Sequence, residues 1–112
     1  MLSERMQTAL NNQIRIEAES SQIYLAMASW SEVKGLEGIA QFMYGQSDEE
    51  RMHMLKMFKY VNERGGKAEV SELNKPADQY GSIKEMFETL FNAPGSGKGL
   101  KVSLMAQPLF CH

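Results

Sequence analysis

The strongest constraint on this chain is a long stretch, residues 3–33, that contains neither glycine nor proline. Residues of high helix propensity dominate it, so an uninterrupted helix is the conformation that it favours. Ser3 can cap the start of that helix, because its hydroxyl can accept a hydrogen bond from a backbone N–H of the first turn. Gly35 can adopt the left-handed conformation that commonly ends helices. The sequence therefore predicts one long helix over residues 3–33.

A second long helix is predicted over residues 37–64, ending at Gly65 and Gly66. The turn between the two helices is short, so they are expected to pack antiparallel as a hairpin. Gly45, inside the second helix, costs about 1 kcal/mol relative to alanine, and we interpret it as the mark of a close helix approach. These features predict an all-α fold built on a long helical hairpin.

A short third helix is predicted after a loop at residues 67–80, which contains Pro76. Ser82 and Glu85 form a capping box, in which each side chain can accept a hydrogen bond from the other's backbone N–H. The third helix is therefore expected to begin near Ile83. It is expected to include four apolar residues: Met86, Phe87, Leu90 and Phe91.

The last part of the chain lacks a helical pattern. Residues 92–112 carry Gly95, Gly97 and Gly99 in alternation, together with two prolines. The run "GSGK" lacks the spacing and the hydroxyl of a phosphate-binding P-loop, and no predicted strand precedes it. We therefore expect a helical domain, residues 1–91, followed by a flexible tail, residues 92–112.

Composition and charge exclude several classes of function. The formal net charge of −2 leaves no basic surplus for the phosphates of nucleic acid. No apolar run is long enough to span a membrane, and the N-terminus lacks the apolar region of a signal peptide. The single cysteine, Cys111, excludes an internal disulfide and fits a reducing compartment. We expect a cytoplasmic protein that binds neither nucleic acid nor membranes.

Polar residues interrupt the apolar stripes of both long helices. At 100° per residue, Glu50 and His53 fall within about 60° of the centre of the second helix's stripe. Glu17 is the only charged residue in the middle of the first helix's stripe, and Tyr24 follows two turns later. An antiparallel hairpin brings Glu17 level with Glu50 and His53, because all three lie at similar distances from the turn.

The same angular positions predict the apolar core of the hairpin. The predicted core residues are Leu10, Ile14, Tyr24, Ile39, Phe42, Met54, Met57 and Val61. A second apolar face lies nearly opposite the stripe of the first helix and consists of Ile16, Ile23, Met27 and Trp30. It either packs within the same bundle or contacts another subunit. We favour the subunit interface, because two opposed apolar faces exceed the need of one core.

Two carboxylates and an imidazole in one core require a physical explanation, because burying an isolated charge is costly. A bound cation provides one, since it converts the mutual repulsion of the carboxylates into shared coordination. Glu50 and His53 are three residues apart, so they project from one helix face. Carboxylate and imidazole ligands suit iron, manganese or zinc, and the absence of cysteine ligands argues against structural zinc. The alternative is a set of hydrogen-bonded polar groups in the core.

A glutamate on one helix and Glu-x-x-His on the next make up half of the ligand set of a di-iron carboxylate bundle. The chain resembles the non-haem ferritins of prokaryotes over residues 1–91. The matching runs are "MLSERMQTALNNQI", "ESSQIYLAMASW", "GLEGIAQFM", "DEERMHMLKMFKYVNERGG" and "LNKPADQY". The resemblance implies a four-helix bundle subunit, assembled with others into a hollow shell. Such a shell oxidises Fe(II) with dioxygen or peroxide and stores the ferric mineral.

The resemblance also implies roles for individual residues. Glu17, Glu50 and His53 correspond to iron ligands of the ferroxidase centre. Tyr24 corresponds to a tyrosine that adjoins this centre, and Glu49 to an acidic residue near it. The haem-binding relatives have a methionine directly after the ligand glutamate, where this chain has arginine, so no haem is expected.

Nothing after residue 91 matches the family, so the sequence predicts an incomplete four-helix bundle. The expected function is iron binding, ferroxidase activity and iron storage as a homo-oligomeric subunit. The alternative is a helical interaction or assembly module that retains the hairpin without its chemistry. A two-fold homodimer could supply the missing ligands, because it would place the same three ligands opposite themselves.

Overall fold

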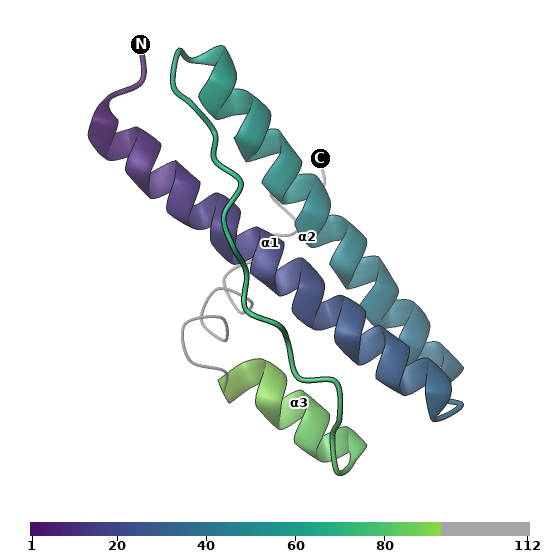
Figure 1. Cartoon of the computed structure of the whole chain (residues 1–112). Helices are drawn as coiled ribbons and strands as arrows, with labels where there is room; N and C mark the ends of the chain where they lie inside the picture. The colour runs from purple at the N-terminus through teal and green to yellow at the C-terminus, as the bar shows by residue number, and fades with distance from the viewer. Residues whose placement is uncertain (93–112) are drawn as a thin grey trace.

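The computed structural model describes residues 1–92, which form three helices (Figure 1). α1 spans Glu4–Val33, α2 spans Glu37–Glu63 and α3 spans Ile83–Asn92. No strand occurs in these 92 residues, so the predicted all-α fold is confirmed. The predicted tail lies outside the described residues from position 93 on. None of the three helices combines the length and the apolarity needed to cross a bilayer.

The ends of the two long helices follow the local signals in the sequence. The Ser3 hydroxyl accepts a hydrogen bond from the backbone N–H of Met6 at 3.2 Å, which caps α1. Gly35 and Gly65 have φ angles of 79° and 84°, a region that L side chains rarely adopt. Both glycines directly follow the residue that caps a helix C-terminus. These glycines therefore explain where α1 and α2 end.

The predicted capping box of α3 is correct on one side and displaced by one residue on the other. The Ser82 hydroxyl accepts a hydrogen bond from the Glu85 backbone N–H at 3.1 Å, as expected. The Glu85 carboxylate accepts from the backbone N–H of Gly81 at 2.9 Å, instead of from that of Ser82. Glutamate is long enough to reach either donor, so the spacing alone did not distinguish them.

α1 and α2 pack side by side along their length as the predicted antiparallel hairpin (Figure 1). Gly45 does not mark a close approach, because a Cβ atom placed there would meet no described atom within 4 Å. Two apolar clusters lie along the hairpin. The cluster at the end away from the turn is formed by Ile14, Val61 and Ala68. The cluster nearer the turn contains Tyr24, Met27, Ala28, Trp30, Met43, Met86 and Leu90.

Most of the predicted core is confirmed. Ile14, Tyr24 and Val61 are buried. Four further predicted residues are half-buried and pack against the two clusters: Leu10, Ile39, Met54 and Met57. Phe42 was predicted to be buried, but 51% of it is exposed. Its position about 60° from the centre of the stripe places it at the edge of the packed face.

The second apolar face of α1 is covered at Met27 and Trp30 by α3. Met27 and Trp30 pack in one cluster with Met86 and Leu90 of α3. Tyr80 meets the Trp30 ring edge-on, with centroids 5.5 Å apart and planes at 90°. The interpretation of this face as a subunit interface is therefore wrong for Met27 and Trp30. The sequence pattern did not show that α3 packs against these residues.

The segment between α2 and α3 lies against α1 and returns the chain toward the turn end of the hairpin (Figure 1). Asn11 holds its beginning: its amide donates to the Lys67 carbonyl at 3.0 Å and accepts from the Glu69 N–H at 2.9 Å. Further along, the Asn74 amide donates to the Glu19 carboxylate at 3.3 Å. These contacts place α3 against Met27 and Trp30 on α1.

The packing of α3 predicts that Met86→Ala destabilises the protein. Met86 is fully buried, so its loss should lower the free energy of unfolding by about 2–5 kcal/mol. Met52→Ala is the matched control, because Met52 on α2 is 51% exposed and should change stability little. Denaturant unfolding followed by circular dichroism measures both variants. Equal effects would contradict the packing of α3 on the hairpin.

Candidate metal centre

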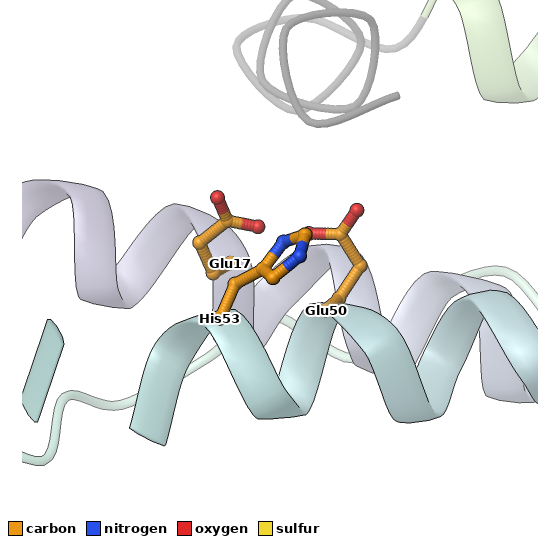
Figure 2. Close-up of side chains that lie close together, drawn as sticks. All are labelled: Glu17, Glu50 and His53. Atoms are coloured by element: carbon orange, nitrogen blue, oxygen red, sulfur yellow. The ribbon is translucent and has the colours of Figure 1, made fainter. Parts of the chain in front are cut away.

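The three predicted ligands converge between the long helices (Figure 2). Glu17 projects from the middle of α1, while Glu50 and His53 project from neighbouring turns of α2 toward the same space. One ligand atom from each residue lies within 4.8 Å of the other two. The exposed fractions are 4%, 0% and 4% for Glu17, Glu50 and His53. The structure thus brings together residues that are 33 to 36 positions apart in the chain.

Helix geometry explains this arrangement. Residues three apart on a helix are surface neighbours, so Glu50 and His53 present their side chains to one side of α2. The antiparallel hairpin then supplies Glu17 from the opposite helix. Among residues 1–92, no other group of three or more histidine, cysteine, aspartate or glutamate residues has this convergence.

The electrostatics of the group favour a cation. Both carboxylate oxygens of Glu50 are buried and have no hydrogen-bond partner among the described residues. One oxygen of Glu17 accepts a hydrogen bond from the Gln13 amide at 3.2 Å. A buried carboxylate without hydrogen bonds is costly, and a positive ion bound to its oxygens removes much of that cost. The residues present therefore fit a metal ion.

The donor atoms restrict which ion fits. Two carboxylates and one imidazole offer oxygen and nitrogen donors, a combination that suits iron, manganese and zinc. The three converging residues include no thiolate, the donor that is typical of structural zinc sites. Three protein ligands also leave coordination positions for solvent, for an oxidant or for further carboxylates. The group can therefore bind an ion that reacts.

Tyr24 is fully buried and lies close enough to Glu17 to be affected by its charge. Burial, followed by the charge of Glu17, raises the pKa of Tyr24 to about 12. The hydroxyl of Tyr24 has no hydrogen-bond partner among residues 1–92, and its ring packs in the apolar cluster nearer the turn. Tyr24 thus adjoins the group as a neutral phenol.

Two further residues lie near the group in the chain. Glu49 is half-buried on α2 and lies outside the converging set, so its auxiliary role stays a prediction. Gln13 was missed, although its amide donates to Glu17. The signal was present in the sequence, since residues four apart on a helix are neighbours that can form such a pair.

Comparison with known families agrees with the geometry of the site. The sequence profile of the ferritin-like domain matches residues 7–93. The chain belongs to the ferritin-like family. This match includes Glu17, Glu50 and His53 and extends to the end of α3. The predicted resemblance is therefore confirmed.

Individual relatives carry ferritin or ferritin-like names. A protein of Haemophilus influenzae named probable bacterial non-heme ferritin-like protein is 43% identical over 91 residues, which are 81% of this chain and 55% of the relative. A bacterial non-heme ferritin of Bacteroides fragilis is 40% identical over 91 residues, or 81% of this chain and 57% of that protein. This ferritin-like chain therefore spans little more than half the length of these curated relatives.

Solved ferritins share this arrangement of helices over about two thirds of their length. The Chlorobium tepidum ferritin superimposes with a TM-score of 0.80 at 33% identity, covering 94% of this chain and 63% of that one. An open pore ferritin from the hyperthermophilic archaeon Archaeoglobus fulgidus gives a TM-score of 0.78 at 34% identity, covering 97% of this chain and 68% of that one. The ferritin-like helical fold is thus shown independently of the site.

The raised pKa of Tyr24 predicts how stability depends on alkaline pH. An unfolded tyrosine loses its proton near pH 10, whereas folded Tyr24 retains it up to about pH 12. The contribution of Tyr24 to stability is therefore complete below pH 10 and is lost as the pH rises toward 12. Wild type should lose more stability across this interval than Tyr24→Phe.

Denaturant unfolding at a series of alkaline pH values tests this expectation. Tyr60→Phe is the control, because Tyr60 is exposed at the far end of α2. Tyrosinate absorbance should also show that Tyr24→Phe lacks a step that titrates late in wild type. Identical pH profiles for wild type and Tyr24→Phe would contradict the burial of the phenol.

Proposed function

We propose that this chain is an iron-storing ferritin-like subunit that binds Fe(II) as its substrate at Glu17, Glu50 and His53 and oxidises it. The convergence of these three side chains within 4.8 Å carries the proposal. The unpartnered oxygens of Glu50 support it, because both carboxylate oxygens are available to a cation. Relatives named bacterial non-heme ferritin support iron as that cation.

The charge of the group explains how it would favour oxidation. The attraction between a carboxylate and an ion grows in proportion to the ion's charge, so two carboxylates stabilise Fe(III) more than Fe(II). Burial between α1 and α2 strengthens this preference, because the local dielectric constant is lower than that of water. Each Fe(II) would give one electron to dioxygen or peroxide, and no haem is required.

A complete di-iron bundle uses two glutamates and two Glu-x-x-His motifs, whereas residues 1–92 bring together one of each. We propose that a homo-oligomer provides the setting in which iron is stored. The remaining ligands would come from a second copy or from outside the described residues. The division into a helical domain, residues 1–91, and a tail, residues 92–112, and a cytoplasmic location are parts of the same proposal.

The second candidate function is an assembly module that keeps the hairpin without ferroxidase activity. The incomplete ligand set of the described residues favours it. The two functions differ in one measurement. A ferroxidase subunit gains near-ultraviolet absorbance when Fe(II) is added with an oxidant, at a rate that depends on protein concentration. An assembly module forms oligomers but leaves the rate of iron oxidation at that of buffer.

The proposal predicts that Glu50→Ala impairs iron binding and oxidation. This substitution removes a ligand, so the effect should exceed the 10- to 100-fold losses typical of residues that only support ligands. Glu63→Ala is the control, because Glu63 is an exposed glutamate at the end of the same helix. Stopped-flow absorbance and equilibrium iron titration measure both variants. Equal iron oxidation by Glu50→Ala and wild type would remove these residues as the site.

A further inference from the structure

A pair of serines connects α1 and α2 about one helical turn from Glu17, Glu50 and His53, here called the candidate metal group. The Ser21 hydroxyl donates to the backbone carbonyl of Ser47 at 2.8 Å. The Ser47 hydroxyl donates in return to the backbone carbonyl of Ser21, also at 2.8 Å. The two hydroxyl oxygens are 3.0 Å apart, so the side chains are in direct contact. A serine side chain of each helix is thus hydrogen-bonded to the backbone of the other helix, and both bonds lie at the same position along the hairpin axis.

The position of this pair determines which residues of the two helices are level. Glu17 lies four residues before Ser21, or about 6 Å along α1. Because α2 is antiparallel, residues after Ser47 extend in the same direction, so Glu50 lies about 4.5 Å and His53 about 9 Å from the pair. Glu17 is therefore placed between Glu50 and His53 in height, as the convergence of the three ligands requires.

A small change in helix register would separate the ligands. A slip of one residue moves a side chain by about 1.5 Å along the helix axis and by about 100° around it. Apolar contacts are non-directional and resist such a slip weakly. Hydrogen bonds lose energy steeply when their angles change, so the paired bonds of Ser21 and Ser47 resist it strongly.

We propose that Ser21 and Ser47 are positioning residues that hold Glu17 opposite Glu50 and His53. This inference rests on the proposed metal-binding function of that group. The serines do not contact the metal; they act by setting the register and the separation of the helices that carry the ligands. Serine suits this task because its small side chain brings its hydroxyl within reach of the backbone of the other helix.

The chemistry of the pair distinguishes positioning from general stabilisation. A carbonyl oxygen has two lone pairs, so Ser21 and Ser47 can keep their helical hydrogen bonds when the cross-helix bonds are removed. Replacing both serines with alanine thus leaves no carbonyl unsatisfied, and such paired removals are often nearly neutral for stability. Metal affinity should respond more strongly than the unfolding transition.

The chain offers a matched control in Ser20. This serine is fully buried and directly precedes Ser21 on α1. Its hydroxyl donates to the Ile16 carbonyl at 2.9 Å, which is within α1 and does not reach α2. Ser20→Ala therefore removes a serine hydroxyl from the same part of α1 without removing a bond between the helices.

The test uses Co²⁺ as a probe of the metal group in the full chain. The double variant Ser21→Ala/Ser47→Ala should bind Co²⁺ about tenfold more weakly than wild type, at the lower end of the range for residues that orient ligands. Its visible absorption bands should also change in intensity, because they report coordination geometry. Ser20→Ala should keep the affinity and the spectrum of wild type. The double variant and Ser20→Ala should have similar unfolding midpoints.

Further measurements separate failure of this inference from failure of the proposed function. Loss of Co²⁺ binding in Glu50→Gln supports the metal site, whereas equal binding by Glu50→Gln and wild type contradicts it. If the metal site holds, unchanged Co²⁺ affinity and spectrum in the double variant overturn the positioning role. The single variant Ser21→Ala decides the question if the double variant does not fold, since Ser21 is only half-buried.

A measurement without metal completes the test. In the metal-free protein, backbone amides near Glu17 and Glu50 should exchange hydrogen faster in the double variant than in Ser20→Ala. Faster exchange confined to this region supports a role in holding the two helices in register. Equal exchange in the two variants overturns the inference, whether or not wild type binds metal.

Discussion

The burial of two carboxylates and an imidazole between two antiparallel helices is the constraint on which the rest of the structure depends. Apolar side chains at the same three positions would pack without any electrostatic cost. The hairpin holds these groups because an apolar cluster lies on either side of them. One cluster is built on Ile14 and Val61, and the other on Met27 and Met43. The candidate metal group is thus a polar interruption of a core that is apolar at both ends.

The third helix contributes to this arrangement from a distance. α3 completes the apolar cluster nearer the turn through Met86 and Leu90. Tyr24 belongs to that cluster, and the charge of Glu17 also raises its pKa, so it links the apolar packing with the candidate metal group. The loop bonded to α1 is what brings α3 there. Contacts distant from the ligands therefore help to keep the ligand-bearing helices together.

Membership of the ferritin-like family and the geometry of the site support the same proposal by separate routes. The family is shown by the match over residues 7–93. The geometry independently shows a buried set of metal-ligand atoms, including carboxylate oxygens without hydrogen-bond partners, and a bound cation would offset the cost of burying that charge. The chain covers 55% and 57% of two curated relatives. The proposed activity therefore concerns a site for which the described residues supply one half of a bundle's ligands.

The sequence by itself determined the three helices and the group formed by Glu17, Glu50 and His53. Caps, helix-ending glycines and the period of 3.6 residues are local properties, so they can be found without knowledge of the fold. The short turn predicts that the two helices are antiparallel, and this alignment predicts that the three side chains lie at similar heights.

Only the tertiary structure decided which surfaces are covered and how closely the helices meet. Phe42 is exposed, while Met27 and Trp30 are covered by α3, although all three are apolar residues on amphipathic helices. The bonds between Ser21 and Ser47 likewise join residues 26 positions apart. Coverage and close contact depend on elements distant in the chain, whereas helix periodicity describes only the face that one helix presents.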